Sequence, residues 1–385
     1  MTTVLQKIVV RHEFPVVFTR CLFRPGNPAL RDVLRRGAGS RPLRCLVLLD
    51  KGAAAAFPDL KQEIRAWFKA HADEFNLVRV PLVLSGGETV KQSTAAVRRM
   101  VDALRAGRIC RHSICLAVGG GAFLDAAGLA AALFHRGVRL VRIPTTALAQ
   151  CDSGVGVKNA INYDGAKNLL GTFAPPWAVL NDTAFLDSLS LPLLLDGVAE
   201  AVKVAAIKDA AFFRSIERAA PKIAARDMPA VRRILRRCAL LHLDHIATSG
   251  DPYELGTARP LDYGHWAAHK LEGLTRHRLS HGHAVAIGIA LDALYAACIG
   301  LMPESQALRL IRTLQTCGLP VFDPELARTD RRGRPAVFDG IEEFRAHLGG
   351  ELTVTFPAPL GSRVELHAID EPLMADCIAA LADFQ

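Results

Sequence analysis

Buried-strand patterns alternate with helical patterns between residues 43 and 143, and this alternation restricts the possible folds more than any other feature of the chain. Continuous apolar runs predict strands at residues 43–50, 77–84, 113–118 and 138–143. Periodic segments between them predict helices at residues 58–71, 89–106 and 122–135. Strands that are separated by helices pair in parallel, because the crossover helices cover the faces of the sheet. We therefore expect a doubly wound parallel sheet of the Rossmann-like type.

The pattern changes after residue 182. Residues 183–320 show helical periodicity without a convincing strand, and residues 352–357 alternate like a short strand. A length of 385 residues also exceeds the usual size of one domain. We expect an α/β N-terminal domain over residues 1–182, opened by an edge strand or hairpin arm at 14–23. A mainly α-helical C-terminal domain should follow over residues 183–385.

Composition and charge argue against several classes of protein. The formal net charge is +9, but no basic stripe interleaved with aromatic residues accompanies it, which favours a small anionic ligand over nucleic acid. Nine cysteines lack a CxxC pair, as is typical of reduced thiols in the cytosol. The first 14 residues contain no signal-peptide core, and the apolar run at 284–300 is interrupted by Asp292 and is too short to span a bilayer. We expect a soluble cytoplasmic protein without a nucleic-acid partner or a membrane span.

Four histidines lie within residues 260–283. His265 and His269 are four residues apart on a helix-compatible run, so both project from one face, and His281 and His283 follow after a basic turn. Imidazoles that converge from adjacent elements are typical of a zinc-type site. Histidines also fill structural positions, and the cluster alone leaves both interpretations open.

A carboxylate that could complete such a site lies upstream. Glu200 stands within the apolar helical pattern of residues 197–208, where an unpaired buried carboxylate is costly. Lys203 is one turn further on and could satisfy it as an ion pair. With the histidines available, we favour a ligand role, because one Glu and two His leave open positions for substrate oxygens.

Two strand ends carry charged residues of the kind that bind dinucleotides. Asp50 ends the first strand, where a carboxylate can accept hydrogen bonds from ribose hydroxyls or can simply cap a turn. The motif SGGETVK at 85–91 follows the next strand and contains Glu88 and Lys91, which could equally form an i,i+3 ion pair.

A glycine run marks a third strand end. Gly119, Gly120 and Gly121 lie where a strand turns into a helix, and Asp125 follows one turn later. Glycines allow the backbone to approach a pyrophosphate, and the helix start directs amides towards it. The run is not the GxGxxG fingerprint and could also serve close packing, but we favour phosphate or dinucleotide binding.

Polar residues are dense between the last strand of the series and the domain boundary. The segment 144–162 is glycine-rich, and the motif KNLLGTF follows at 167–173. Such a loop would line a crevice at the strand ends, where open α/β sheets bind ligands. The polar residues concerned are Thr145, Thr146, Asp152, Lys158, Lys167 and Asn168.

In this order the motifs resemble the sugar phosphate cyclases, the superfamily typified by 3-dehydroquinate synthase. The matching pieces are SGGETVK, GGGAFLD, PTTALAQCDSGVGVK, KNLLGTF, AEAVK, LDYGHWAAH and LSHGHAV, collinear over residues 85–290. The resemblance implies a dehydroquinate synthase-like fold, NAD and a divalent metal, zinc or cobalt, as cofactors. Within the superfamily the chain looks closest to the dehydroquinate-synthase-like proteins of bacterial Ebo gene clusters.

The resemblance also implies roles for individual residues. The metal ligands would be Glu200, His265 and His281. The NAD site would comprise Asp50, Glu88, Lys91, Gly119, Gly120, Gly121, Asp125, Thr145, Thr146, Lys158 and Lys167. The sugar phosphate would contact Asp152, Lys158, Lys167, Asn168, Lys203, Asp262 and His269. Arg345 is a candidate phosphate contact, and Arg136 matches an arginine that reaches the neighbouring subunit's phosphate in the family, which implies a homodimer.

The chemistry implied by the resemblance is a sequence of four steps. A ring hydroxyl of the phosphorylated sugar is transiently oxidised, phosphate leaves by β-elimination, the ketone is reduced again, and an intramolecular aldol reaction closes the carbocycle. Lys158, Lys203 and His269 would stabilise the negative charge that develops.

Departures from the family pattern concern the substrate. Dehydroquinate synthases hold a substrate carboxylate with a lysine and an arginine, whose positions here are Asp244 and Ala258. Asp262 replaces an asparagine, and His283 replaces a glutamate. We therefore expect a heptose phosphate without a carboxylate, such as sedoheptulose 7-phosphate.

Three alternatives remain. The chain could be a 3-dehydroquinate synthase with a rearranged carboxylate clamp. It could be a metal-dependent polyol dehydrogenase, although that group usually has one Asp and three His as ligands. It could also be an inactive protein that binds the cofactors without turnover.

Overall fold

The computed structural model describes residues 2–39, 41–164, 166–253, 260–347 and 350–384. Contacts divide the chain into two units, the first formed by Met1–Pro144 with Val157–Asp182 and the second by Thr145–Gly156 with Thr183–Gln385. We expected one division after residue 182. The segment 145–156 departs from that expectation, because its contacts lie with the helical unit. The boundary that we expected after residue 182 stays a prediction. Ala258 lies outside the described residues.

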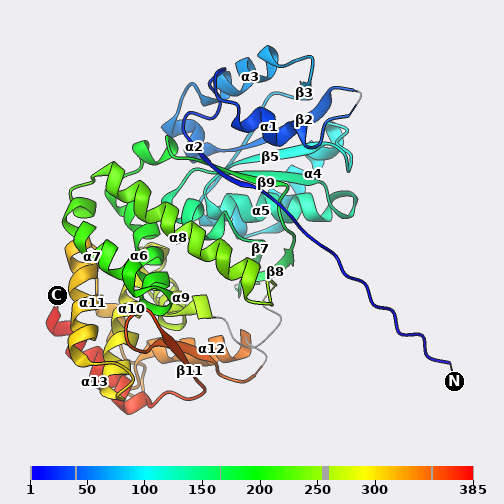
Figure 1. Ribbon diagram of the computed structural model, residues 1–385. Helices are drawn as coiled ribbons and strands as arrows, with labels where there is room; N and C mark the ends of the chain where they lie inside the picture. Colours follow the sequence, from blue (N-terminus) through cyan, green and yellow to red (C-terminus); the bar gives the residue numbers. More distant parts are fainter. Residues whose placement is uncertain (1, 40, 165, 254–259, 348–349, 385) are drawn as a thin grey trace. The chain divides into compact units, whose positions relative to one another are not determined.

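The first unit is built on a parallel sheet, drawn from blue through cyan to green in Figure 1 with helices packed against it. Its strand order is β1-β9-β6-β5-β2-β3, and β4 also pairs with β2. The strands are β1 (Val16–Thr19), β2 (Leu43–Asp50), β3 (Phe75–Leu77), β4 (Leu82–Leu84), β5 (Ile114–Gly119), β6 (Arg139–Pro144) and β9 (Ala178–Asp182). The helices are α1 (Ala29–Arg35), α2 (Lys51–Ala56), α3 (Leu60–Ala70), α4 (Thr94–Ala106) and α5 (Gly121–Leu133). The expected parallel α/β architecture is confirmed.

Two predicted elements differ in detail. The strand expected at 77–84 is two short strands, β3 and β4, because Pro81 between them has no N–H to donate to a ladder. The helix expected at 89–106 begins later, at Thr94. A 3₁₀ turn, η1 (Glu88–Lys91), precedes it, and the Ser93 side chain caps the helix by accepting a hydrogen bond from the Ala95 N–H.

A β-hairpin occupies part of the segment that the sequence suggested was a loop. β7 (Lys158–Tyr163) pairs antiparallel with β8 (Ala166–Phe173), apart from the main sheet. The fully buried Arg142 of β6 donates hydrogen bonds to the Lys158 carbonyl at 2.8 Å and to Asn159 Oδ1 at 2.6 Å. A Cβ at Gly128 would lie 1.5 Å from Asn159 Oδ1, so the glycine allows the hairpin to pack against α5. These fixing contacts are distant in sequence, and local patterning therefore could not predict the hairpin.

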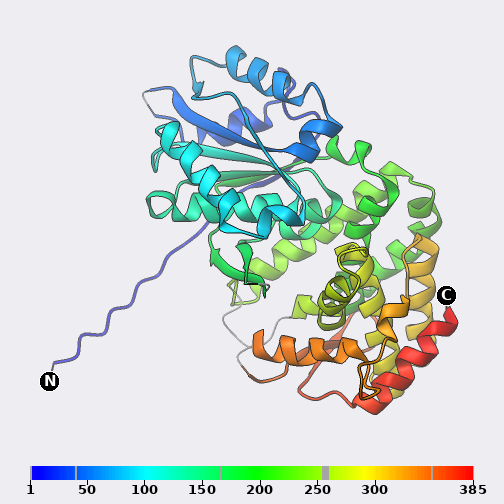
Figure 2. The same ribbon diagram turned by 180° about the vertical axis from the view of Figure 1, so that it is seen from behind.

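The second unit is mainly helical, as expected. Its helices are α6 (Leu191–Lys208), α7 (Ala210–Ala224), α8 (Met228–Thr248), α9 (His265–Leu274), α10 (His281–Cys298), α11 (Glu304–Cys317), α12 (Asp339–His347) and α13 (Glu371–Leu381). A two-stranded ribbon, β10 (Val354–Pro357) with β11 (Arg363–Leu366), contains the strand expected at 352–357. In Figure 2, α11 and α13 flank the central helix α10, which also contacts α6 and α9. Helix α10 is long and apolar enough to cross a membrane, but 78% of it is buried inside the protein, as in a core helix.

The start of α9 is anchored to α10. Gly264 caps α9 in the left-handed conformation (φ +77°), and its N–H donates to Asp292 Oδ2 at 3.1 Å. Trp266 Nε1 donates to Asp292 Oδ1 at 2.9 Å. A Cβ at Gly288 would lie 2.1 Å from the Gly264 carbonyl oxygen, so close packing requires glycine there. These contacts fix the backbone on both sides of His265.

Asp292 should make folding stability depend on pH. Burial raises the pKa of Asp292 to about 8 from its ordinary value of 3.8. Below pH ~4 the carboxyl is protonated in both states; between pH ~4 and ~8 the unfolded chain ionises first, so the contribution of Asp292 to stability is lost as pH rises. The variant Asp292→Asn lacks this titration and can accept from only one of the two donors. We expect it to be less stable than the wild type at pH 5, with a gap that narrows by pH 8 in urea unfolding of the metal-free proteins. A gap that stays constant with pH would contradict the assignment.

Candidate functional site

The centre of the candidate site is a buried ion pair on α6. Glu200 is fully buried, Lys203 is 2% exposed, and Lys203 Nζ forms an ion pair with Glu200 Oε2. Neither carboxylate oxygen of Glu200 has a hydrogen bond of normal geometry to any described residue. Burial acts to raise the pKa of Glu200, but the Lys203 charge, together with His281 and His265, outweighs it and the pKa falls to about 2. The group is therefore a buried carboxylate with unused acceptor capacity, a costly arrangement unless another positive charge binds to it.

Two histidines bring nitrogen atoms to this carboxylate. His265 and His281 are the first residues of α9 and α10, and their Nε2 atoms lie 3.8 Å and 3.4 Å from Glu200 Oε1. The ligand atoms of all three residues lie within 4.8 Å of one another. Ligands about 2.0–2.1 Å from zinc at tetrahedral angles are roughly 3.4 Å apart. The spacing therefore fits one divalent cation.

The other ring nitrogen of each histidine is held by a buried acceptor. His265 Nδ1 lies 3.0 Å from the Tyr263 carbonyl oxygen, and His281 Nδ1 lies 3.2 Å from Glu272 Oε2. A carbonyl or an ionised carboxylate can only accept, so each Nδ1 carries the proton. Each ring then directs Nε2 towards Glu200, and this nitrogen can bind a metal that displaces any proton it carries, as in the carboxylate–histidine–metal arrangements of known sites.

Glu272 is a site residue that the sequence analysis missed. It is 3% exposed and lies on α9, seven residues after His265 and therefore on the same face of the helix. That spacing was a signal that could have identified it. His269, Glu272 and His281 also form a second group of ligand-type atoms within 4.8 Å.

Replacement of Glu272 should weaken metal binding without removing a ligand. In Glu272→Gln the amide can still meet the ring of His281, but it no longer fixes which nitrogen is protonated. We expect zinc affinity to fall by roughly 10–100-fold, the usual effect of changing a residue that orients a ligand. Competition with a chromophoric chelator would measure it, with Glu304→Gln at the exposed start of α11 as the control. Equal zinc affinity in Glu272→Gln and the wild type would refute this role.

Lys203 also faces a second carboxylate. Asp152 belongs to η3 (Ala149–Ser153), a π-helical turn, and its Oδ2 lies 4.0 Å from Lys203 Nζ. His242 Nδ1 of α8 lies 3.0 Å from Asp152 Oδ1. Burial would raise the pKa of Asp152, but the Lys203 and His242 charges outweigh it and hold the pKa well below the ordinary value. The sequence analysis predicted Asp152 and Lys203 as substrate contacts but did not single out His242.

The remaining histidines and Asp262 lie around this centre. The ring of exposed His269 lies 5.3 Å from that of His265 and 5.8 Å from that of His281, between centroids. Asp262 is half-buried and its charge acts on both Lys203 and His265. His283 Nε2 is buried and makes no hydrogen bond to a described residue. Asp262 and His269 thus belong to the same cluster as the candidate ligands.

In the first unit, Asp50 and the glycine run meet at the strand ends. Asp50 caps α2 by accepting from the Gly52 N–H at 2.7 Å, which is the capping role considered as the alternative. Its other oxygen faces the Gly120 N–H at 3.4 Å. A Cβ at Gly86 would lie 2.1 Å from Asp50 Oδ1, and one at Gly119 would lie 2.8 Å from Asp50 Cβ. The glycines therefore leave room for backbone to approach this carboxylate closely.

The start of α5 can accept an anion. Gly120 caps this helix without a side chain, so the first backbone amides are not occupied by a capping group. Lys91 Nζ donates to Asp125 Oδ2 at 2.8 Å, whereas Glu88 is exposed. The i,i+3 ion pair between Glu88 and Lys91 that we considered is therefore absent from the described contacts. The arrangement fits a dinucleotide with its pyrophosphate at the start of α5.

The other predicted residues are distributed over several elements. Lys158, Lys167 and Asn168 lie on the hairpin, with Lys158 and Asn168 exposed. Arg136 is exposed with a left-handed backbone (φ +63°). Within the helical unit, Thr146 Oγ1 accepts from the Ala149 N–H, Thr145 is buried, and Arg345 Nη2 lies 3.5 Å from Glu342 Oε1.

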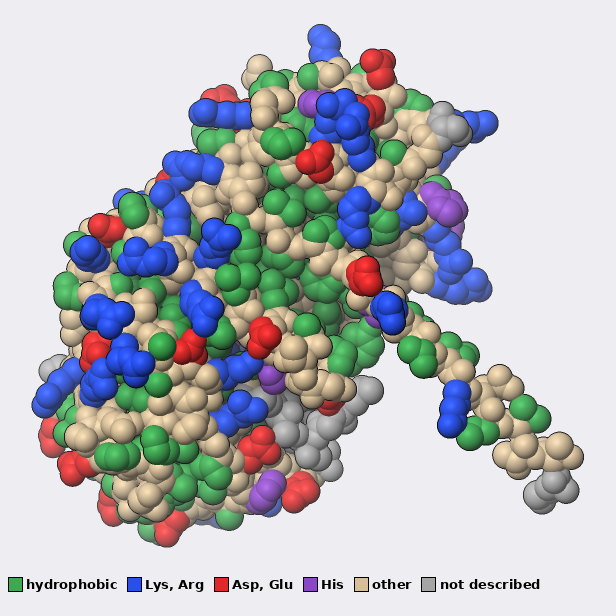
Figure 3. Space-filling model, in the orientation of Figure 1, with side chains coloured by type: hydrophobic (Ala, Val, Ile, Leu, Met, Phe, Trp, Pro, Cys, Tyr) green, Lys and Arg blue, Asp and Glu red, His purple; other side chains and the backbone are tan. Residues whose placement is uncertain are grey.

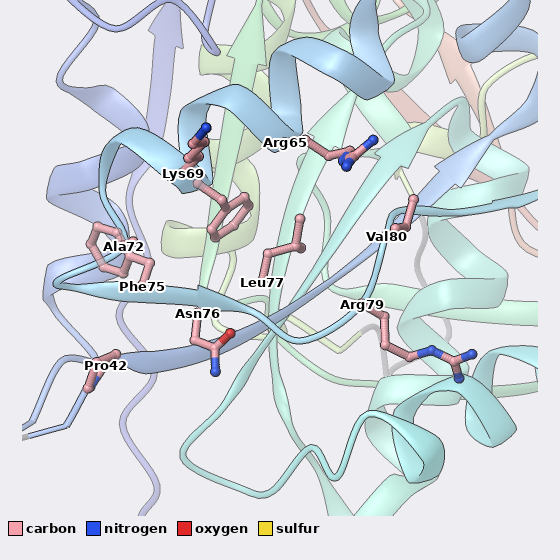
Figure 4. Close-up of a pocket in the computed structure, with 10 residues that line it drawn as sticks. Pro42, Arg65, Lys69, Ala72, Phe75, Asn76, Leu77, Arg79 and Val80 are labelled. Atoms are coloured by element: carbon pink, nitrogen blue, oxygen red, sulfur yellow. The ribbon is translucent and has the colours of Figure 1, made fainter.

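A surface hollow of about 470 Å³ lies elsewhere in the first unit, between α3 and β3 (Figure 4). Phe68 is among its apolar lining residues. Figure 4 shows Phe75 and Leu77 in the same lining, with Arg65, Lys69 and Arg79 around them. None of the predicted site residues lines it, so we assign it no part in the chemistry. Figure 3 shows Lys and Arg side chains scattered over the visible face without a single stripe.

Comparisons with known proteins support the family resemblance that the order of the motifs indicated. Family models described as 3-dehydroquinate synthase N-terminal and C-terminal match residues 81–194 and 197–331. A 3-dehydroquinate synthase of Rhodopseudomonas palustris (strain BisB18) is 33% identical over 365 residues, 93% of each chain. A 2-epi-5-epi-valiolone synthase of Actinoplanes sp. (strain ATCC 31044 / CBS 674.73 / SE50/110) is 36% identical over 357 residues, 90% of this chain and 85% of the other. The solved 2-epi-5-epi-valiolone synthase of Streptomyces hygroscopicus subsp. jinggangensis 5008, with NAD⁺ and Zn²⁺ bound, has a TM-score of 0.87 at 28% identity, covering 99% of this chain and 100% of that one.

Proposed function

The chain belongs to the 3-dehydroquinate synthase family of sugar phosphate cyclases and is an enzyme of this class, and from that premise we propose that it cyclises a heptose phosphate that lacks a carboxylate. The relatives are named both as 3-dehydroquinate synthases and as 2-epi-5-epi-valiolone synthases, so the family alone does not select the substrate. We therefore base the choice of substrate on the residues at the positions where the family binds a substrate carboxylate.

The observation that supports this substrate is the charge at one position of α8. Asp244, which stands where dehydroquinate synthases have a lysine, is exposed on α8. Burial, followed by the charges of Lys208 and His242, lowers the pKa of the adjacent His245 to about 4, so this ring is neutral at pH 7. Lys208 is close enough for the Asp244 charge to act on it, which offsets its attraction for another anion. Arg363 of β11 also acts on Lys208 and His245, so positive charge is present nearby, but a substrate carboxylate would meet the negative charge of Asp244 at the position where dehydroquinate synthases have a lysine.

We assign two cofactors to the enzyme. Glu200, His265 and His281 would hold zinc or cobalt, and the strand ends around Asp50 and Gly120 would hold NAD, as NAD⁺ and Zn²⁺ are bound in the solved valiolone synthase. When bound, they supply a hydride acceptor and a Lewis acid that favours ionisation of a substrate hydroxyl. The chain's own contribution is electrostatic: the Lys203 ammonium stabilises negative charge that develops on the substrate, and His269 supplies a further polar contact.

Assembly and location are part of the same proposal. All nine cysteines are free thiols, which supports a cytoplasmic location. The exposed Arg136 would reach the phosphate bound by a second subunit of a homodimer.

Phosphate release from two substrates tests the proposal. The purified protein with NAD⁺ and Zn²⁺ should release phosphate from sedoheptulose 7-phosphate and have little activity on the carboxylate-bearing heptulosonate phosphate that dehydroquinate synthases use. Asp244→Lys should shift the ratio of kcat/KM towards the carboxylate-bearing substrate by about tenfold, or ~1.4 kcal/mol. Asp244→Asn, which only removes the negative charge, should shift it less. Turnover of the carboxylate-bearing substrate alone by the wild type would instead identify a 3-dehydroquinate synthase.

A further inference from the structure

His242 has no role in the chemistry described so far, yet it contacts the charged network at the candidate metal centre. It lies on α8, and its side chain is 14% exposed. Its Nδ1 lies 3.0 Å from Asp152 Oδ1. A histidine on the side of a helix is often only a packed or solvated residue. Whether His242 has a further role therefore depends on the other contacts of Asp152.

Asp152 links His242 to the lysine beside the ligands. Asp152 Oδ1 faces His242, and Oδ2 lies 4.0 Å from Lys203 Nζ. Lys203 Nζ in turn pairs with Glu200 Oε2, and Glu200 Oε1 faces the two candidate ligand histidines. The side chains thus form one continuous chain from α8 to the metal centre. Asp152 lies on a π-helical turn, a local distortion that is frequent at functional sites.

The direction of the hydrogen bond follows from charge. The pKa of Asp152 lies well below its ordinary value, because the Lys203 and His242 charges outweigh its burial, so the carboxylate is ionised at neutral pH. An ionised carboxylate only accepts hydrogen bonds, and His242 Nδ1 must therefore carry the proton. Both the neutral Nδ1–H form and the imidazolium meet this requirement.

The Lys203 ammonium forms described ion pairs with two carboxylates, Glu200 and Asp152. Of these, Glu200 is also a candidate metal ligand. A cation bound by His265 and His281 would draw on Glu200, in competition with Lys203. Asp152 offers the ammonium a second anionic partner only while its Oδ2 points towards Lys203. With Oδ1 held by His242, the carboxylate keeps that orientation.

We propose that His242 is a positioning residue: by holding Asp152 Oδ1, it directs Asp152 Oδ2 at Lys203 and so keeps Glu200 available to the metal. This inference rests on the proposed function for its kinetic consequence, but its consequence for metal binding stands without it. It predicts that the contact made by Nδ1 matters and that the rest of the ring does not.

Three substitutions separate the Nδ1 contact from packing. Asn places its amide nitrogen close to the position of His Nδ1, whereas Gln places it near Nε2, and Leu has no donor. We expect His242→Leu and His242→Gln to raise the zinc Kd and lower kcat by roughly tenfold or more, as for other residues that orient a metal site. His242→Asn should stay within about threefold of the wild type in both. Arg233→Leu, on the exposed face of the same helix, controls for a new leucine on α8.

Zinc affinity is measured by chelator competition and kcat by phosphate release, after circular dichroism has established that each variant is folded. Wild-type values in His242→Leu and His242→Gln would overturn the proposal, and so would a His242→Asn variant as impaired as His242→Leu. Should the wild type release no phosphate from any sugar phosphate, the proposed function fails, and the zinc titrations of the same variants still decide the role of His242.

Discussion

Replacement of Glu200 by Gln is expected to abolish stable metal binding and to lower phosphate release on the order of 10³-fold. Glu200 is the only one of the three candidate ligands that carries a negative charge, and its oxygen lies 3.4–3.8 Å from both histidine nitrogens. Loss of a Lewis acid removes several kcal/mol of charge stabilisation, and 1.4 kcal/mol corresponds to a factor of ten in rate. Metal analysis of the dialysed protein and single-substrate kinetics would measure the two effects.

A double variant separates metal loss from misfolding. Glu200→Gln leaves Asp152, at 4.0 Å, as the remaining described ion-pair partner of the buried Lys203, and a broken buried pair typically costs about 3–5 kcal/mol. Combining it with Lys203→Met removes the stranded charge, so the double variant should regain thermal stability but neither metal nor activity. Normal zinc content in Glu200→Gln would refute the ligand assignment.

The sequence predicted what depends on local patterning and missed what depends on distant contacts. The parallel strands and the helical second half followed from apolar periodicity. The β7–β8 hairpin could not be predicted in this way. Arg142 and Gly128, which contact it, lie at least 16 residues before Lys158 and Asn159, their partners in the hairpin, and leave no periodic signal. Pro81 could have indicated a break in the strand predicted at 77–84, but the long apolar run favoured one continuous strand.

The same distinction applies to the site. Glu200, His265 and His281 could be predicted as candidate ligands because the two histidines share one short window and the carboxylate interrupts an apolar helix. His242 was overlooked because its partner, Asp152, is 90 residues away in sequence. Asp292 appeared only as an interruption of an apolar run, whereas its two oxygens accept hydrogen bonds from both sides of His265. Residues that orient ligands thus depend on tertiary contacts, which spacing alone does not reveal.

Competition for Glu200 also predicts opposite signs for two neighbouring substitutions. Lys203→Met removes the cation that pairs with Glu200, so zinc should bind at least as tightly as in the wild type, whereas Glu200→Gln abolishes binding. Phosphate release should nevertheless fall by roughly 10²–10³-fold, because the buried ammonium no longer stabilises negative charge on the substrate. Metal-free Lys203→Met should be destabilised by about 3–5 kcal/mol, since the buried Glu200 then lacks its lysine partner, and zinc should restore most of that loss.

Thermal unfolding with and without zinc, together with chelator competition, measures these effects on one preparation. Lys203→Arg is the matched control: it keeps a positive charge beside Glu200, so its metal-free form should remain more stable than Lys203→Met. A Lys203→Met variant that binds zinc more weakly than the wild type would contradict the competition, because it would mean that Lys203 supports the metal rather than opposing it. The sign of the change in zinc affinity therefore decides whether the ammonium at this site serves the substrate or the metal.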